Sequence, residues 1–176
     1  KLVLTIKKFN EVSKFKSEIL QDASISKLDQ IEKCVNNINE LNKDVKTIWS
    51  SYSGNYNIYK DIVIKKYTIN IEKIDSLLKI LKSKKKAQEK LEDIISNKNQ
   101  FPEVEDINNL DTAITEAEQH NNYTNVSPTI PDNLNKDKYY LDTLLARDLK
   151  NLLTLKNKTQ NIIKTFLTQE SILDIN

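Results

Sequence analysis

The sequence predicts an all-α protein, specifically an up-and-down four-helix bundle. Three observations lead to this prediction. Apolar residues recur three or four positions apart along most of the 176 residues, as they do on a helix with one buried face. No segment shows the alternation of a strand. The chain also has a single glycine, Gly54, where about a dozen are usual for this length. We therefore expect one helical-bundle domain over residues 1–176.

The first two amphipathic segments are residues 1–22 and 27–53, and the second has the clearest pattern in the chain. Between them the sequence DASIS at 22–26 gathers helix-capping residues. A four-helix bundle requires residues 1–53 to form one helix kinked near residues 22–26, and we favour that interpretation slightly. The alternative is two separate helices with a break at this point.

The stretch SSYSGNYN at 50–57 separates two long helices. Gly54 fits the left-handed position just after a helix, where other residues meet a steric cost. We interpret it as the corner of a helical hairpin. The spacing then resumes and predicts a helix from about 56 to 97 without interruption.

The last third of the chain predicts a short helix, a loop and a long helix. Pro102 suits a first helical position, and the helix that follows extends to about His120. Residues 121–133 are polar, contain two prolines and predict a loop. A final helix from about 136 to 172 has a row of inward apolar residues: Leu141, Leu145, Leu149, Leu152, Leu155, Ile162, Ile163, Phe166 and Leu173. No sequence repeat is visible beyond the common heptad spacing.

Composition argues against several classes of function. The net charge is +2 with one arginine, which makes nucleic-acid binding improbable. No run reaches the roughly 18 apolar residues of a membrane span. The sequence offers few residues for catalysis or cofactor binding, because the chain has one histidine and no glycine-rich phosphate loop. We expect no enzyme activity, no cofactor, no metal and no small-molecule substrate.

Two single residues have a chemical and a structural interpretation. His120 with Glu116 forms an i, i+4 pair that a metal could share, but metal sites usually need three or four ligands. We expect a solvated histidine near a helix end. Cys34 lies on an apolar stripe, and we expect a small buried side chain rather than a reactive thiol.

Polar residues interrupt the apolar rows at five positions, namely Asn42, Asn70, Lys84, Gln88 and Thr159. The structural interpretation is that they fix helix register or lie on an exposed edge. The functional hypothesis is that they weaken the core, so that the bundle opens and exposes its apolar stripes. In that case replacing Asn42 and Asn70 with leucine raises the melting temperature and lowers activity.

A basic face is a further candidate site, formed by Lys82, Lys84, Lys85 and Lys86. These lysines suit contact with phosphates or anionic headgroups. A solvated helical face is the commoner outcome for such a run.

The style of the sequence resembles that of secreted helical proteins of malaria parasites. The resemblance is carried by lysine-, asparagine- and isoleucine-rich helices such as KCVNNINELNKDVKTIW and KYTINIEKIDSLLKILKSKKK. Spirochaete surface lipoproteins and coiled segments of parasite reticulocyte-binding proteins share much of this style. The resemblance implies microneme-type secretion from the motile sporozoite stage and a role in host-cell traversal or invasion. It gives no residue a role.

We therefore expect a non-enzymatic, secreted or cell-surface protein that contacts a host membrane or a host protein, with a monomer favoured. The alternative is a cytoplasmic scaffold subunit whose amphipathic helices pack against partner helices. A signal peptide before Lys1 would favour the secreted protein.

Overall fold

The structure is a computed structural model that describes residues 2–50, 57–96, 103–126, 130 and 136–173. These residues form helices joined by short connections, and none of them lies in a strand. The all-α prediction is confirmed, but the four-helix bundle is not. Gly54 and Pro102, with their predicted turn and helix start, lie outside the described residues.

The chain divides into two compact units. Unit 1 comprises residues 1–83 and 124–139, and unit 2 comprises residues 84–123 and 140–176. Helix α4 (Glu72–Ile95) supplies residues to both. Each unit has its own hydrophobic cluster. The single domain expected over residues 1–176 stays a prediction. The two separate hydrophobic clusters were not part of that prediction.

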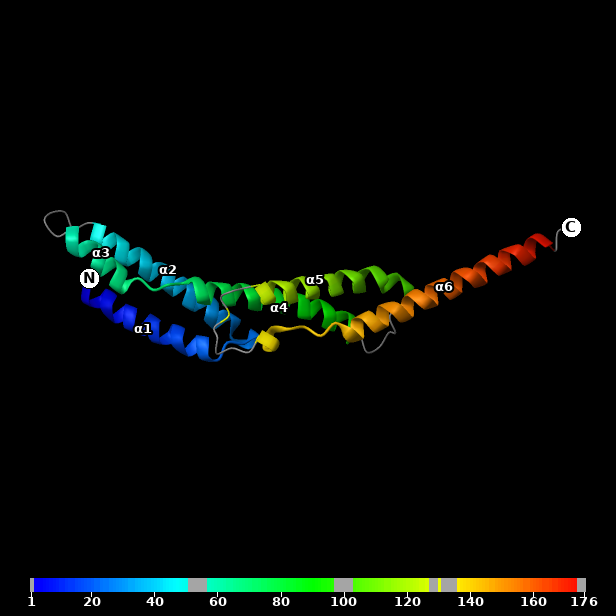
Figure 1. Ribbon diagram of the computed structural model, residues 1–176, viewed down its shortest axis with the longest axis horizontal. Coiled ribbons are helices and arrows are strands. Elements are labelled where there is room, and N and C mark those ends of the chain that lie inside the picture. The colour runs from blue at the N-terminus through cyan, green and yellow to red at the C-terminus, as the bar shows by residue number, and fades with distance from the viewer. Residues whose placement is uncertain (1, 51–56, 97–102, 127–129, 131–135, 174–176) are drawn as a thin grey trace. The chain divides into compact units, whose positions relative to one another are not determined.

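Unit 1 begins with a helical hairpin (Figure 1). Helix α1 (Leu2–Gln21) is followed by a short 3₁₀ helix, η1 (Ile25–Lys27), and by α2 (Leu28–Ser50). The Nζ atom of Lys8 lies 3.4 Å from a carboxylate oxygen of Glu40 and 3.7 Å from one of Asp44. The start of α1 therefore lies beside the end of α2. The break predicted at residues 22–26 is confirmed, but the favoured single kinked helix is wrong, because the chain folds back on itself there.

The long helix predicted from 56 to 97 is also wrong, because it is broken at residues 68–71. Helix α3 (Asn57–Tyr67) ends before this stretch and α4 begins after it. The side chain of Asn42 on α2 holds the break: its Nδ2 donates to the Ile69 carbonyl oxygen, and its Oδ1 accepts from the Ile69 N–H, both at 2.9 Å. A side-chain amide has the donor and acceptor of a peptide group, so it satisfies both backbone groups at once.

The core of unit 1 combines one face each of α1, α2 and the first part of α4. Its fully buried members include Ile31, Ile38 and Leu41 of α2 and Ile74 and Leu77 of α4. The 3–4 spacing predicted this face of α2, which is confirmed as the buried face. Burial of one such side chain stabilises a fold by about 1.5–3 kcal/mol.

Unit 2 contains residues 84–95 of α4, the 3₁₀ helix η2 (Val104–Asp106), most of α5 (Ile107–Val126), and α6 (Leu144–Leu173). The predicted ends shift, because α5 continues six residues past His120, and residues 136–139 form the 3₁₀ helix η3 (Lys136–Tyr139) instead of the start of the last helix. A second asparagine holds the connection before α6: Asn121 makes two hydrogen bonds of 2.9 Å with the N–H and C=O of Leu141.

The two asparagine contacts belong to an internal structural repeat. Residues 25–45 and 104–124 both consist of a 3₁₀ helix followed directly by an α-helix. All six buried positions of the first segment correspond to buried positions of the second: Ile31 to Leu110, Cys34 to Ala113, Val35 to Ile114, Ile38 to Ala117, Leu41 to His120, and Val45 to Thr124. Asn42 and Asn121 are the only identical pair in these two segments. The pattern of burial therefore shows a structural repeat that was not predicted from the residue identities.

Candidate functional site

The most prominent surface feature is a row of exposed apolar side chains on α6, which we call the α6 apolar face. Its members are Leu145, Leu152, Leu155, Ile162, Ile163, Phe166 and Leu167, each between 53% and 64% exposed. At 1.5 Å per residue the face is about 33 Å long. A contiguous apolar surface of this kind usually marks a site of interaction.

The first part of α6 packs on one side only. Ala146 and Leu153 are buried in the cluster of unit 2, whereas Leu145 and Leu152 beside them are exposed. Every residue from 158 to 169 is exposed. Figure 1 shows this orange-to-red part of α6 extending past the other helices of unit 2. The predicted inward positions are wrong for Leu145, Leu152, Leu155, Ile162, Ile163 and Phe166, because the described part of unit 2 provides no helix to cover them.

The charge on this part of α6 has one sign. Residues 149–169 contain four lysines and no carboxylate. Lys150 and Lys156 form ion pairs with Asp111 of α5 and with Glu103, which precedes η2. For Lys158 and Lys164 no partner occurs among the described residues. The exposed half of α6 therefore offers an apolar surface with two lysines available to a negatively charged ligand.

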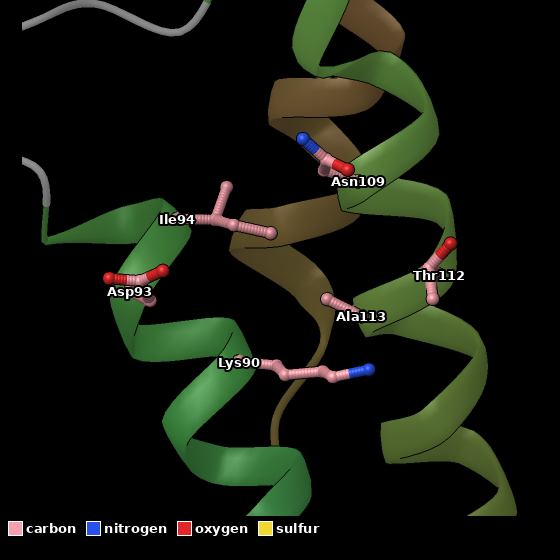
Figure 2. Close-up of a pocket in the computed structure, with 6 residues that line it drawn as sticks. All are labelled: Lys90, Asp93, Ile94, Asn109, Thr112 and Ala113. Carbon is pink, nitrogen blue, oxygen red and sulfur yellow. The ribbon is translucent and has the colours of Figure 1, made fainter.

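A shallow groove between α4 and α5 in unit 2 is a second candidate (Figure 2). It has a volume of about 340 Å³ and is lined by Lys90, Asp93, Ile94, Asn109, Thr112 and Ala113. Lys90 extends from α4 toward α5, where its ammonium group pairs with Glu116. The ammonium group of this groove is therefore already engaged in an ion pair. A similar groove of about 350 Å³ lies between α1 and α2.

The two chemically interesting residues of the sequence are both buried. Cys34 is fully buried in α2, as predicted, and burial raises the pKa of its thiol to about 11. The predicted solvated position of His120 is wrong, because its side chain is 1% exposed. His120 occupies the repeat position of Leu41, on the inner face of α5. Among the described residues no group of three or more histidine, cysteine, aspartate or glutamate side chains is placed to bind a metal.

The five polar positions are scattered rather than gathered into one opening device. Asn42 fixes the connection before α4, and the Oδ1 of Asn70 accepts a 2.8 Å hydrogen bond from the Glu72 N–H at the start of that helix. The Thr159 hydroxyl donates to the Leu155 carbonyl oxygen of its own helix.

The remaining two of these positions lie on α4. Gln88 is half-buried and donates a 2.6 Å hydrogen bond to Glu92, and Lys84 is half-buried. Asn42, Asn70, Gln88 and Thr159 therefore each make a hydrogen bond within the folded chain. That the core opens stays a prediction.

The predicted basic face is partly neutralised by neighbouring carboxylates. Lys82 pairs with Glu32 of α2 at 2.7 Å, and Lys85 lies 3.8 Å from Glu89. Lys86 is exposed, and Lys84 is half-buried. That these four lysines form a binding face stays a prediction.

Comparison with models of protein families, with characterised proteins and with solved structures gave no match. Among the described residues no helix is long and apolar enough to cross a membrane. The candidate site therefore depends on the geometry of α6.

Proposed function

We propose that this chain is a non-enzymatic protein that acts by contact, with the α6 apolar face as its binding surface. The single observation that supports this is the exposure of seven large apolar side chains along one helix. A large exposed apolar surface lowers the solubility of a protein. Stable folds therefore usually bury such a surface, unless a binding partner covers it. The proposal does not require the core to open, because this surface is already accessible.

The binding partner in this proposal is a protein. Helices that lie on membrane surfaces usually carry a strongly basic polar face. In the exposed half of α6 only Lys158 and Lys164 are available, and the other polar residues are mainly threonine, asparagine and glutamine. Packing against another helix requires no such charge density. If the resemblance to secreted malaria-parasite proteins holds, the chain is secreted and the partner is a host protein met during cell traversal.

Two alternatives make different predictions. Contact with a host membrane is supported by the absence of carboxylates from residues 149–169. An intracellular scaffold subunit is supported by the same apolar face, which would then pack against helices of a permanent partner. Both alternatives share the non-enzymatic, contact-based mechanism and differ in what covers α6.

Binding of the labelled full chain to mammalian cells, measured by flow cytometry, tests the proposal. The double variant Leu155→Asn/Ile162→Asn removes part of the α6 apolar face. The matched control Val3→Asn/Leu4→Asn removes two side chains of α1 that are 79% and 70% exposed. We expect the α6 variant to lose about tenfold in binding, the control to bind normally, and protease treatment of the cells to abolish binding.

Three results would contradict the proposal. Equal binding by the α6 variant and the native chain would show that α6 is not the binding surface. Protease-resistant binding that phosphatidylserine vesicles reproduce would identify the membrane as the partner. A chain that binds no cell and is insoluble without a co-expressed protein would support the scaffold subunit.

A further inference from the structure

The starts of α4 and α6 have the same local structure. Before each helix lies a four-residue connection, residues 68–71 or 140–143, whose second residue is held by an asparagine from another helix. The third residue of each connection, Asn70 or Asp142, accepts a hydrogen bond from the N–H of the first helical residue, at 2.8 Å and 2.9 Å. These matches align α6 with α4, so that residue 144 corresponds to residue 72.

The packing of α4 extends this correspondence. Residues 72–83 of α4 belong to unit 1, and residues 84–95 belong to unit 2. In unit 2 the side chains of Ala87 and Leu91 are 2% and 5% exposed, in one cluster with Leu110 and Ala113 of α5. One helix thus contributes residues to two successive units and to both hydrophobic clusters, as a helix shared between repeated modules does.

Helix α6 packs in unit 2 as the start of α4 packs in unit 1. Ala146 and Leu153 are buried in unit 2, as the corresponding Ile74 and Leu81 of α4 are in unit 1. Leu152 differs, because it is 63% exposed where the corresponding Ile80 is fully buried.

Helix α6 also carries side chains suited to pack in a further unit, as the end of α4 packs in unit 2. Under the same alignment Leu91 and Ile94 of α4 correspond to Ile163 and Phe166 of α6. These two side chains are 53% and 64% exposed. The residues that would join α6 to a further unit are therefore present, and no described helix covers them.

We propose that residues 158–169 of α6 form the first helix of a third helical unit, and that a partner protein supplies its second helix, an acidic amphipathic helix built like α5. This inference rests on the proposed function, because it names the kind of partner that covers the α6 apolar face. Charge supports an acidic partner. In unit 2, α5 places Glu116 against Lys90 and Asp111 against Lys150, and the exposed half of α6 offers two further lysines.

A second copy of this chain is a poorer occupant. The apolar faces of α2 and α5, which have the required pattern, are already buried within their own units. Pairing of α6 with another α6 would bring together two stretches that contain lysines and no carboxylates. Neither helix would supply the opposite charge.

The test uses the full chain and a fluorescent peptide of residues 103–126, held helical by a hydrocarbon staple between positions 108 and 112, which are exposed on α5. Fluorescence anisotropy measures binding. We expect saturable binding that Ile163→Asn/Phe166→Asn weakens by about tenfold or more. The control Val3→Asn/Leu4→Asn should bind within about twofold of the native chain. Lys158→Glu/Lys164→Glu should weaken binding because it repels the acidic peptide.

Several results would overturn the inference. The first is absence of peptide binding, and the second is binding that Ile163→Asn/Phe166→Asn leaves unchanged. Sedimentation that shows a dimer lost in the same variant would assign this surface to a second copy. Vesicle binding lost in that variant would assign it to lipid. If the peptide fails while cell binding still depends on the α6 apolar face, the inference falls and the proposed function stands.

Discussion

Replacing Asn42 with alanine should destabilise unit 1 by removing both hydrogen bonds to Ile69. Asn42 is half-buried and the Ile69 residue is 7% exposed, so its N–H and C=O have restricted access to water. A typical protein hydrogen bond contributes about 0.5–1.5 kcal/mol, and an unsatisfied buried partner costs about 1–3 kcal/mol. With two bonds at a half-buried position, we expect a loss of about 2 kcal/mol. The melting temperature should fall by about 4–8 °C for a chain of this size.

Urea unfolding and hydrogen exchange read out this change. In Asn42→Ala the amides of residues 69–75 should exchange faster, while those of residues 141–147 keep their protection. Asn121→Ala should give the opposite pattern, because its side chain holds Leu141 in unit 2. Asn36→Ala is the control, since Asn36 is exposed on the same helix as Asn42. A stability of Asn42→Ala within about 0.5 kcal/mol of this control would refute the reasoning.

The same contacts change the expectation for leucine at this position. The sequence alone predicts that Asn42→Leu stabilises the core, because leucine completes an apolar row. The structure shows that the row is interrupted in order to hold the Ile69 backbone. Leucine leaves those backbone groups without this partner, so we now expect Asn42→Leu to lower the melting temperature as alanine does.

Three further outcomes follow from burial. Burial raises the pKa of the Cys34 thiol to about 11, so at about pH 8 the thiol should react with a disulfide reagent at least tenfold more slowly than in urea. The raised pKa also contributes to the stability of the folded chain. This contribution is complete below about pH 9 and is lost as the pH rises toward 11. Leu153→Ala should cost about 2–5 kcal/mol in a urea titration, whereas Leu155→Ala, at a position that is 63% exposed, should change stability by less than about 0.5 kcal/mol. Amides of residues 158–169 should exchange faster than those of residues 146–157, because an unpacked helical segment of this length is marginally stable in water. Equal protection of the two stretches in the native chain would mean that other residues cover the end of α6.

The sequence predicted the elements that depend on local pattern. The capping residues at 22–26 marked a true break, and the 3–4 spacing identified the buried face of α2. The breaks at 68–71 and 140–143 were missed because their cause is not local. Each depends on an asparagine 27 or 20 residues earlier in the chain, and in the sequence Asn42 and Asn121 look like ordinary polar helix residues in an asparagine-rich chain.

The α6 apolar face could not be predicted for a different reason. The sequence shows that the apolar residues of α6 span a wide arc of the helix surface. It does not show whether neighbouring helices cover the whole arc or half of it. Adjacent apolar pairs such as Leu152–Leu153 and Ile162–Ile163 were the available signal. They show that the arc is wider than a two-helix contact requires, but exposure is decided by how many helices surround α6.

The internal repeat shows how far two segments can differ in sequence and still bury the same positions. In residues 25–45 and 104–124 the repeated properties are the positions that are buried and one asparagine that holds a backbone. Which face of a helix is buried depends on the spacing of its side chains rather than on the identity of each one. The two segments can therefore differ at every other position and still fold alike. By the same argument, a helix that covered residues 158–169 would require apolar side chains at the right spacing on α6. Ile163 and Phe166 have this spacing and are exposed to water.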